Sequence, residues 1–280
     1  MSGFSAEWLA LREPADHRAR NREVAAALAA RLAQRERVEV VDLGCGSGSN
    51  LRAMAELLPA RQSWTLVDLD EGLLAAARAA LSGWSDTARE LPGGNVALTK
   101  SGREIDVTFR RADLAADVEA AIGEAPSLVT AAALFDLAAP AFIARTARAV
   151  TSRDALFYTV LTYNGIQHWG PRHPSDNRVT SAFNRHQMSD KGLGASAGPT
   201  APVCLADAFR AAGYGVIEGD SPWRLAAPRD ATLIAELVSG QAAAALETGT
   251  VDRRDVERWS AVTRTSAEVG HTDTFAFPQS

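Results

Sequence analysis

The feature that most constrains the fold is a short β-branched run that ends in three closely spaced glycines. Residues 38–43 read as a buried strand, and residues 51–58 then resume a helical spacing of apolar side chains. Between these two segments stand Gly44, Gly46 and Gly48. Glycine lets a backbone turn sharply and approach a ligand closely, so the segment predicts a strand, a ligand-binding loop and a helix in succession.

The rest of the chain continues this alternation. Further strands are expected at 64–69, 105–110, 128–134, 155–162, 214–218 and 271–277. Helices are expected over 6–35, with an interruption near Pro14, and over 71–81, 138–150, 203–212, 229–247 and 252–269. Residues 82–100 contain Pro92, Gly93 and Gly94 and are expected to form a loop or irregular excursion. Strands that alternate with helices favour a parallel sheet.

Length and composition favour one elaborated domain. The chain has 280 residues, of which 46% are hydrophobic, enough to bury a sizeable core. We divide the domain 1–280 into an N-terminal helical lid and first helix (1–37), a cofactor-binding core (38–162), an acceptor-side insertion (163–202) and C-terminal helices with the last strands (203–280). An irregular segment as long as the insertion is expected to have a functional or lid-like role.

Composition also excludes several classes of function. No run approaches the ~20 uncharged apolar residues that cross a bilayer, and residues 1–20 lack an apolar signal-peptide region, so a cytoplasmic protein without a membrane partner is expected. A formal charge of −5, from 29 basic and 34 acidic residues, disfavours nucleic acid as a partner. The only cysteines, Cys45 and Cys204, are expected to be plain thiols, because two distant cysteines indicate neither a disulfide framework nor a zinc site.

The residues around the glycines identify the loop more closely. An acidic residue ends the strand two positions before the first glycine, in the run Asp42-Leu43-Gly44-Cys45-Gly46-Ser47-Gly48-Ser49-Asn50. A dinucleotide fingerprint would place its third glycine where this chain has Ser49, so a nucleotide-dependent oxidoreductase is a weak alternative. The spacing instead resembles motif I of the class I S-adenosylmethionine-dependent methyltransferases.

This resemblance extends to two later strand ends and implies their roles. Asp68 matches the acid that binds the ribose hydroxyls, while Asp70 is either the reserve candidate or a helix cap. Asp113 matches the acceptor of the adenine amino group, and Leu114 matches the residue that flanks the ring. The cofactor implied is S-adenosyl-L-methionine. We add Arg20 because arginine pairs well with a carboxylate, which gives the cofactor-binding set Asp42, Gly44, Cys45, Gly46, Gly48, Asn50, Asp68, Leu69, Asp113, Leu114 and Arg20.

The resemblance also implies the fold and the activity. The fold is an α/β, doubly wound, mostly parallel seven-stranded sheet with an antiparallel last strand at 271–277, a helical lid and insertions. No Asn-Pro-Pro-Tyr motif of nucleic-acid methyltransferases appears in the strand at 128–134, which favours methyl transfer to a small molecule. We expect the protein to be a monomer or homodimer. That strand also lacks an acid at its start, so a non-methylating or regulatory S-adenosylmethionine-binding protein of the same fold is the alternative.

The methyl acceptor is expected to meet the insertion 163–202, because ligands of open α/β sheets bind outside the carboxyl ends of the strands. His186 is the first candidate for a base or orienting residue and His168 is the second, since histidine exchanges protons near neutral pH. Each histidine could equally be a surface or locally hydrogen-bonded side chain. Together with His173 they lack a recognisable ligand spacing, so no metal site is predicted.

Overall fold

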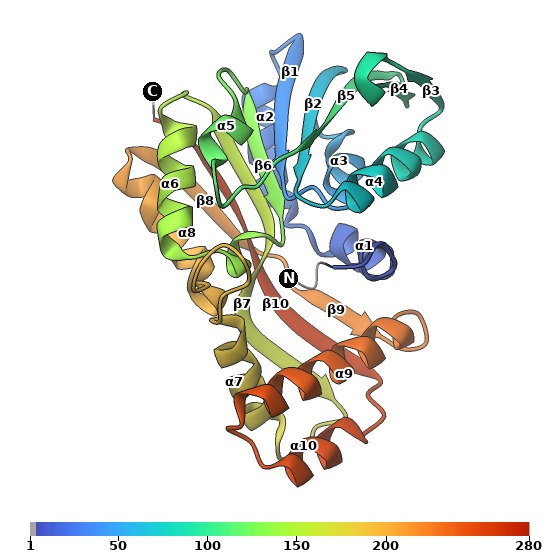
Figure 1. Cartoon of the computed structure of the whole chain (residues 1–280), viewed down its shortest axis with the longest axis vertical. Helices are drawn as coiled ribbons and strands as arrows, with labels where there is room; N and C mark the ends of the chain where they lie inside the picture. The colour runs from blue at the N-terminus through green and yellow to red at the C-terminus, as the bar shows by residue number, and fades with distance from the viewer. Residues whose placement is uncertain (1–3, 280) are drawn as a thin grey trace.

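A ten-stranded sheet runs through the part of the molecule that the structure describes and separates two layers of helices (Figure 1). The structure is a computed structural model that describes residues 4–279. The strand order is β3 (Thr87–Glu90), β4 (Val96–Lys100), β5 (Arg103–Arg111), β2 (Arg61–Asp68), β1 (Arg37–Leu43), β6 (Leu128–Ala132), β7 (Leu156–Gly170), β10 (Ser266–Pro278) and β8 (Tyr214–Asp220), with β9 (Trp223–Ala226) paired to β10.

Five central strands, β1, β2, β5, β6 and β7, run parallel to their neighbours in this group, whereas β10 is antiparallel to both β7 and β8. This topology confirms the predicted doubly wound, mostly parallel sheet with an antiparallel last strand. Three additional strands, β3, β4 and β9, extend the seven that were expected to ten.

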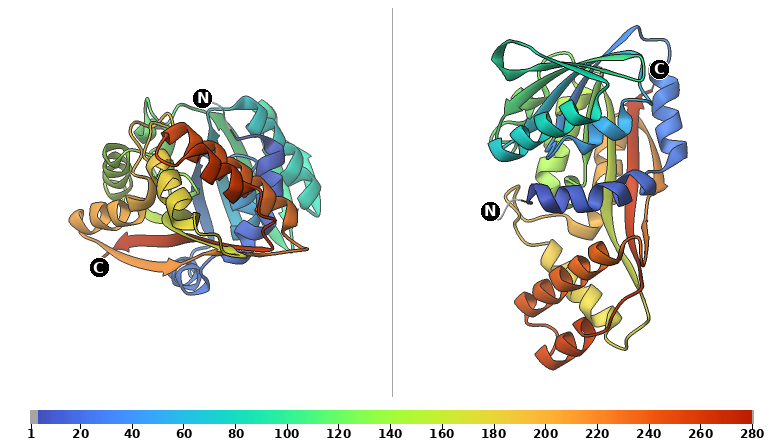
Figure 2. Two further views of the ribbon diagram at one scale, coloured as in Figure 1. Left: turned by 90° about the horizontal axis from the view of Figure 1, so that it is seen from below. Right: turned by 90° about the vertical axis from the view of Figure 1, so that its right-hand side faces the viewer.

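Helices cover both faces of the sheet (Figure 2). One apolar core joins the sheet to α2 (Arg22–Leu32), α3 (Ser49–Met54) and α4 (Glu71–Trp84), and a second joins it to α5 (Val118–Ile122), α6 (Pro140–Thr151) and α8 (Ala201–Ala211). In β1, Val38 and Val40 belong to the first core, while Val41 and Leu43 belong to the second. A strand that is buried on both faces has apolar side chains in succession, which explains the β-branched run in the sequence.

β7 and β10 extend beyond the other strands and carry a helical layer at their far end (Figure 1). This layer consists of α7 (Asp176–Gln187), α9 (Ala231–Thr248) and α10 (Arg253–Ser260). The buried guanidinium of Arg264 lies 3.0 Å from the carboxylate of Asp176, and the indole of Trp259 donates to the same carboxylate at 2.8 Å. These contacts fix α7 and α10 to each other and to the end of β10.

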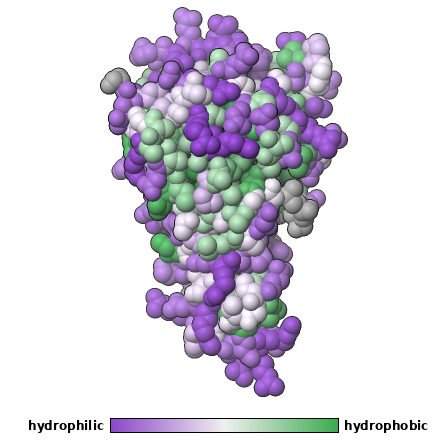
Figure 3. All heavy atoms as spheres, turned by 60° about the vertical axis from the view of Figure 1, so that its left-hand side comes forward, coloured by the Kyte–Doolittle hydropathy of each residue, from purple (hydrophilic) through white to green (hydrophobic). Residues whose placement is uncertain are grey.

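Within residues 4–279, no helix is both long and apolar enough to span a bilayer. Figure 3 shows apolar side chains gathered across the middle of one face, between strongly hydrophilic ends. Scattered apolar side chains, such as the exposed Val203 of α8, are usual on protein surfaces, so we assign this face no role.

The N-terminal helical segment breaks at a different place from the one predicted. α1 (Ala6–Ala19) runs through Pro14, and the break falls at Arg20 and Asn21 instead. The side-chain oxygen of Asn21 accepts hydrogen bonds from the backbone N–H groups of Glu23 and Val24, at 3.0 and 3.1 Å. This cap begins α2 and therefore decides where the segment divides.

Three other predicted boundaries were wrong. The segment 82–100, expected to be a loop or irregular excursion, contains the end of α4 and the antiparallel pair β3 and β4, because Val96 and Leu98 are buried and the 3-10 turn Pro92–Gly94 reverses the chain. β7 continues to Gly170 because it pairs with β10 along its length. The helix expected over 252–269 ends at Ser260, since residues from Ser266 onwards pair with β7 and β9. The short elements α5 and β9 were not predicted.

Candidate functional site

A cavity of about 780 Å³ opens at the carboxyl ends of the central parallel strands. Its walls come from α1, the glycine loop, the ends of β2, β5 and β6, the segment that follows α7, and Glu247 of α9. This is the edge at which open α/β sheets bind ligands. Ten of the eleven predicted cofactor-binding residues line the cavity, the exception being Gly48, and so does His186; His168 does not.

The three glycines of the loop adopt backbone angles that other residues rarely reach. Gly44, Gly46 and Gly48 have φ angles of 63°, 52° and 74°. A Cβ atom on Gly46 would lie 2.9 Å from Leu9 of α1, and Gly48 begins α3 in the left-handed conformation. The glycines therefore let the loop turn beneath α1, and a side chain at position 46 would force the Leu9 side chain to move.

Asp68 ties two loops together at the end of β2. One carboxylate oxygen accepts from the N–H of Gly46 at 2.9 Å, and the other accepts from the N–H of Asp70 at 3.0 Å. Each oxygen keeps a further lone pair, so the side chain can also accept from ligand hydroxyls. Asp70 instead caps α4, because its Oδ1 accepts from the N–H groups of Gly72 and Leu73. The helix-cap interpretation of Asp70 is confirmed.

A buried polar chain lies behind the glycine loop. The amide of Asn50 donates to Asp42 at 2.8 Å and to the hydroxyl of Thr130 at 3.1 Å. Its carbonyl oxygen accepts from the guanidinium of Arg20 at 2.9 Å. Burial raises the pKa of Asp42 to about 7, opposed by the Asn50 hydrogen bond and by the positive charge of Arg20. The chain thus links the end of α1 to the end of β1 and to β6.

This corner contains buried polar atoms that have no hydrogen-bond partner among residues 4–279. They are Oδ2 of Asp42, Nε and Nη1 of Arg20, and the hydroxyl of Tyr158, which lies beside the Arg20 guanidinium. An unsatisfied buried donor or acceptor costs about 1–3 kcal/mol. Because Asp42 and Arg20 both line the cavity, a ligand with a positive and a negative group would satisfy them.

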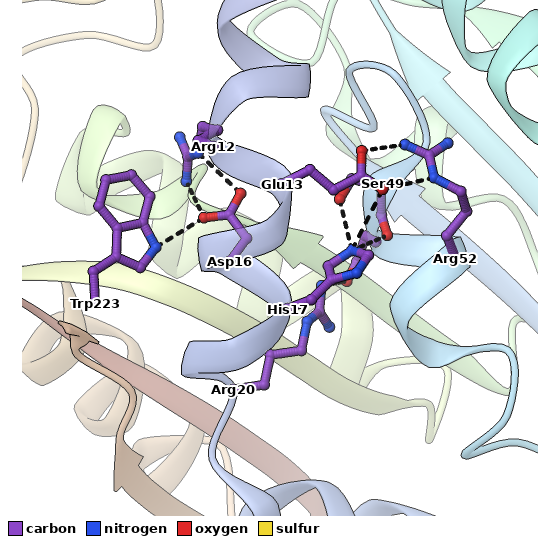
Figure 4. A network of polar contacts seen from close by, with 9 residues as sticks. Arg12, Glu13, Asp16, His17, Arg20, Ser49, Arg52 and Trp223 are labelled. Atoms are coloured by element: carbon purple, nitrogen blue, oxygen red, sulfur yellow. Dashed lines mark hydrogen bonds and ion pairs between the residues drawn. The ribbon is translucent and has the colours of Figure 1, made fainter. Parts of the chain in front are cut away.

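Helix α1 is bound to both sides of the cavity (Figure 4). Towards β9, Arg12 donates to Asp16 at 2.9 Å, and the indole of Trp223 donates to the same carboxylate at 2.9 Å. Towards α3, Glu13 accepts from Arg52 at 2.8 Å, and the ring of His17 contacts Ser49, directly after the glycine loop, at 3.0 Å. Such an arrangement couples α1 to the glycine loop and to the C-terminal strands.

The end of β5 supplies the next part of the wall. Asp113 is exposed, and one of its carboxylate oxygens accepts from the N–H of Ala115 at 2.9 Å. Leu114 is buried, whereas Leu69, at the end of β2, is 40% exposed. The structure therefore brings the predicted ribose and adenine residues to adjacent strand ends on one cavity wall.

The opposite wall holds a cluster of three polar side chains. His186 Nε2 lies 2.9 Å from a carboxylate oxygen of Glu247, and Nζ of Lys191 lies 3.3 Å from Nδ1 and 3.5 Å from Nε2 of the same ring. A carboxylate can only accept, so the contact with Glu247 requires a proton on Nε2. Both ring nitrogens of His186 are therefore in contact with protein groups.

The segment after α7 is held to the loop after β6 by backbone hydrogen bonds. The N–H of Ala139 donates to Leu193 at 3.0 Å, and the N–H of Ala197 donates to Ala138 at 2.7 Å. The hydroxyl of Ser196 adds a bond of 2.8 Å to the carbonyl of Leu137. These bonds favour a fixed wall over the lid that the composition suggested.

His168 and His173 lie apart from this cavity wall. His168 is exposed on β7, opposite Glu268 of β10, because β7 continues past the expected end of the strand. The ring of His173 accepts from the N–H of Ser175 and so helps to form the turn before α7. Within residues 4–279, no three His, Cys, Asp or Glu side chains gather in an arrangement that could hold a metal ion.

Sequence reasoning missed part of the cavity wall. The side chains that line the cavity but were not predicted as site residues include Arg12, Asp16, Lys191 and Glu247. The spacing of Arg12 and Asp16, four residues apart in a helix, was a usable signal for a paired side-chain contact. No local pattern marks Glu247, which reaches His186 from a helix 61 residues away in sequence.

Comparisons with known proteins agree with this geometry. The model of a family described as a methyltransferase domain matches residues 40–125, which contain the glycine loop, Asp68 and Asp113. The whole fold is similar to a cyclopropane-fatty-acyl-phospholipid synthase-like protein from Lactobacillus casei, with 14% identity, 98% of this chain and 95% of that chain covered, and a TM-score of 0.56.

Two further solved structures resemble the chain to a similar degree. A cyclopropane synthase from Mycobacterium tuberculosis has 12% identity, covers 98% of this chain and 94% of its own, and gives a TM-score of 0.51. A candidate methyltransferase from Bacillus halodurans has 13% identity, with 91% and 99% covered and a TM-score of 0.50. No curated protein sequence matches the chain significantly. Residues 40–125 thus match a methyltransferase domain, and the fold around them is the Rossmann-like fold of class I methyltransferases.

Proposed function

We propose that this methyltransferase uses S-adenosyl-L-methionine and methylates a small molecule. The observation that carries the proposal is the unsatisfied pair in one corner of the cavity, Oδ2 of Asp42 as an acceptor and Nε and Nη1 of Arg20 as donors. An α-amino acid presents an ammonium group and a carboxylate on one carbon, and the methionine end of this cofactor is such a group. A hydrogen bond from a guanidinium to a carboxylate is charge-assisted, so a free N–H of Arg20 is a strong donor to the carboxylate end.

The other end of the cofactor has a matching place along the same wall. Asp68 accepts from the ribose hydroxyls with the lone pairs that Gly46 and Asp70 leave unused. The apolar side chains of Leu69 and Leu114 flank the adenine, and Asp113 accepts from its amino group. The cavity supports this order because these residues lie at the ends of neighbouring strands, β2 and β5.

The chain contributes alignment and exclusion of water to the reaction. When bound, the cofactor supplies an electrophilic methyl group on a sulfonium centre. Apolar side chains of Leu134, Leu137 and Leu161 line the cavity and shield the reacting atoms from water. An acceptor that the cavity holds in line with the methyl group has already lost most of its freedom of movement, so it loses little further entropy in the reaction.

We assign His186 an orienting role rather than that of a free base. Its Nε2 faces Glu247, and Nζ of Lys191 lies against the ring, so the ring holds these two side chains on the acceptor side of the cavity. His186→Ala is expected to lower turnover more than cofactor affinity, because the ring contacts no residue of the proposed cofactor wall. Single-turnover rates and a cofactor titration of the variant measure the two effects separately.

The test of the proposed function uses Arg20→Met, which keeps an apolar stem of similar length. A charge-assisted hydrogen bond contributes about 1.5–3 kcal/mol, so affinity for adenosylhomocysteine in calorimetry should fall roughly ten- to a hundredfold. Arg22→Met is the matched control, because Arg22 is exposed and does not line the cavity. Unchanged affinity in Arg20→Met would refute the placement of the methionine end. Tight binding of S-adenosylmethionine without formation of adenosylhomocysteine in any acceptor mixture would favour the non-methylating alternative.

A further inference from the structure

Acidic side chains outnumber basic ones on the cavity wall. Seven carboxylates and three cationic side chains line it, the acids being Asp16, Asp42, Asp68, Asp70, Asp113, Asp190 and Glu247 and the bases Arg12, Arg20 and Lys191. Six acids still face three bases, an excess of three, even if Asp42, with a pKa of about 7, is counted as protonated. A cleft lined by one sign of charge attracts ligands of the opposite sign and repels those of the same sign.

Two of the three cations are not free to bind an anionic acceptor. Arg12 donates to both oxygens of Asp16, at 2.9 and 3.2 Å. Arg20 donates to Asn50 and, in the proposed function, faces the cofactor carboxylate. Lys191 contacts the ring of His186 and has further N–H donors, so an anionic group could reach this cation. An acceptor with a phosphate or carboxylate group would still meet a surplus of negative charge that one cation does not offset.

Two carboxylates stand on the acceptor side and keep unused oxygens. Asp190 accepts from the N–H of Gly192 at 2.7 Å through Oδ1, and Glu247 contacts His186 through Oε2. Among residues 4–279, the remaining oxygen of each makes no hydrogen bond to protein. The side chain of Glu247 is 68% exposed, so its carboxylate is accessible both from the cavity and from bulk water.

Apolar side chains line the same cavity as these carboxylates. They include Leu134, Leu137, Leu161 and Leu193. A ligand that fills it must combine an apolar body with a group that a carboxylate binds. A charged amine meets both requirements, because an ammonium group donates to carboxylates and is attracted by the net charge of the wall.

We infer that the methyl acceptor is an amine with an apolar substituent, which enters as an ammonium ion and is held by Asp190 and Glu247. This inference rests on the proposed function and specifies its substrate class. Before the reaction the ammonium nitrogen loses a proton to the carboxylate of Glu247, which passes it to bulk water. The nitrogen lone pair then forms the new bond to the methyl carbon as the carbon–sulfur bond breaks. Sulfur keeps the electron pair of that bond, and the methylated nitrogen carries the positive charge until it releases a proton.

The test compares three probes that share one apolar body. The full chain, saturated with adenosylhomocysteine, is titrated calorimetrically with phenethylamine, phenethyl alcohol and hydrocinnamate, which are cationic, neutral and anionic near neutral pH. Phenethylamine is expected to bind most tightly and to lose affinity as salt is raised, since screening weakens attraction between charges. Isotope-labelled S-adenosylmethionine then shows whether the amine also accepts a methyl group.

Variants that remove a negative charge and a variant that removes a positive charge should change the affinity for the amine in opposite directions. Glu247→Gln should lower the affinity for phenethylamine about two- to fivefold, the range of a solvent-exposed ion pair. Asp190→Asn, which keeps an acceptor for Gly192, should have a similar effect. Lys191→Met removes a repelling charge and should raise the affinity instead. Glu236→Gln is the matched control, because Glu236 is exposed on the same helix as Glu247 and does not line the cavity.

Three results would overturn the inference: hydrocinnamate binding at least as tightly as phenethylamine, amine affinity that none of the charge variants changes, or no amine binding up to about 10 mM. Failure of the proposed function is recognised separately. If the unmodified chain does not bind adenosylhomocysteine, both proposals fall, whereas a chain that binds it but prefers the anionic probe refutes only the amine acceptor.

Discussion

Alanine at position 68 removes a carboxylate that has two kinds of partner, the backbone of two loops and the proposed ribose hydroxyls. Loss of the charge-assisted bonds to the ribose should cost about 1.5–3 kcal/mol of binding free energy, or roughly ten- to a hundredfold in affinity. The N–H groups of Gly46 and Asp70 also lose their acceptor, but Asp68 is only partly buried and water can replace it. The free energy of unfolding should therefore fall by only about 1 kcal/mol.

Asp70→Ala provides the matched comparison two residues away. Its carboxylate caps α4, so its removal should cost about 1 kcal/mol of stability and lower the melting temperature by a few degrees, much as Asp68→Ala does. Affinity for S-adenosylmethionine should stay within about twofold of the unmodified chain. Calorimetry for binding and thermal unfolding for stability measure the two quantities. The reasoning is refuted if both variants lose affinity equally, or if Asp68→Ala binds the cofactor normally.

Three further predictions follow from buried groups and from the loop after α7. Asp42 has a pKa of about 7 without ligand. Affinity for the cofactor ammonium should therefore fall by up to about tenfold per pH unit below pH 7, and Asp42→Asn should abolish this pH dependence. A pH dependence that persists in the variant would assign it to another group. Burial lowers the pKa of His271 to about 3, so between about pH 6.5 and pH 3 only the unfolded chain takes up this proton. The free energy of unfolding should therefore fall as pH drops towards 3, by up to about 1.4 kcal/mol per pH unit. Urea unfolding at two pH values should show this fall in the unmodified chain and not in His271→Phe, and an equal pH dependence in both chains would disprove it. The amides of Ala139 and Ala197 should exchange slowly with solvent even in the empty chain, whereas rapid exchange that slows only on ligand binding would restore the lid interpretation.

Local patterns in the sequence determine the cofactor half of the site. The β-branched run, the three glycines and the helical spacing after them require only neighbouring residues to specify a strand, a turn with positive φ angles and a helix. The family resemblance assigned Asp68 and Asp113, near two strand ends, to the ribose and the adenine. The structure places both on one cavity wall, because the carboxyl ends of parallel strands meet at one edge of a sheet.

Tertiary structure alone decided the remaining contacts, because they join segments that no periodicity relates. Arg20 reaches Asn50 across 30 residues, Asn50 reaches Thr130 across 80, and Trp223 reaches Asp16 across 207. The continuation of β7 to Gly170 depends on its antiparallel partner β10, near the other end of the chain, and this pairing carries His168 away from the cavity. Side-chain partners of this kind depend on which elements pack together. The polar atoms of Asp42 and Arg20 that lack a hydrogen-bond partner become buried only once α1, β1 and β6 enclose them.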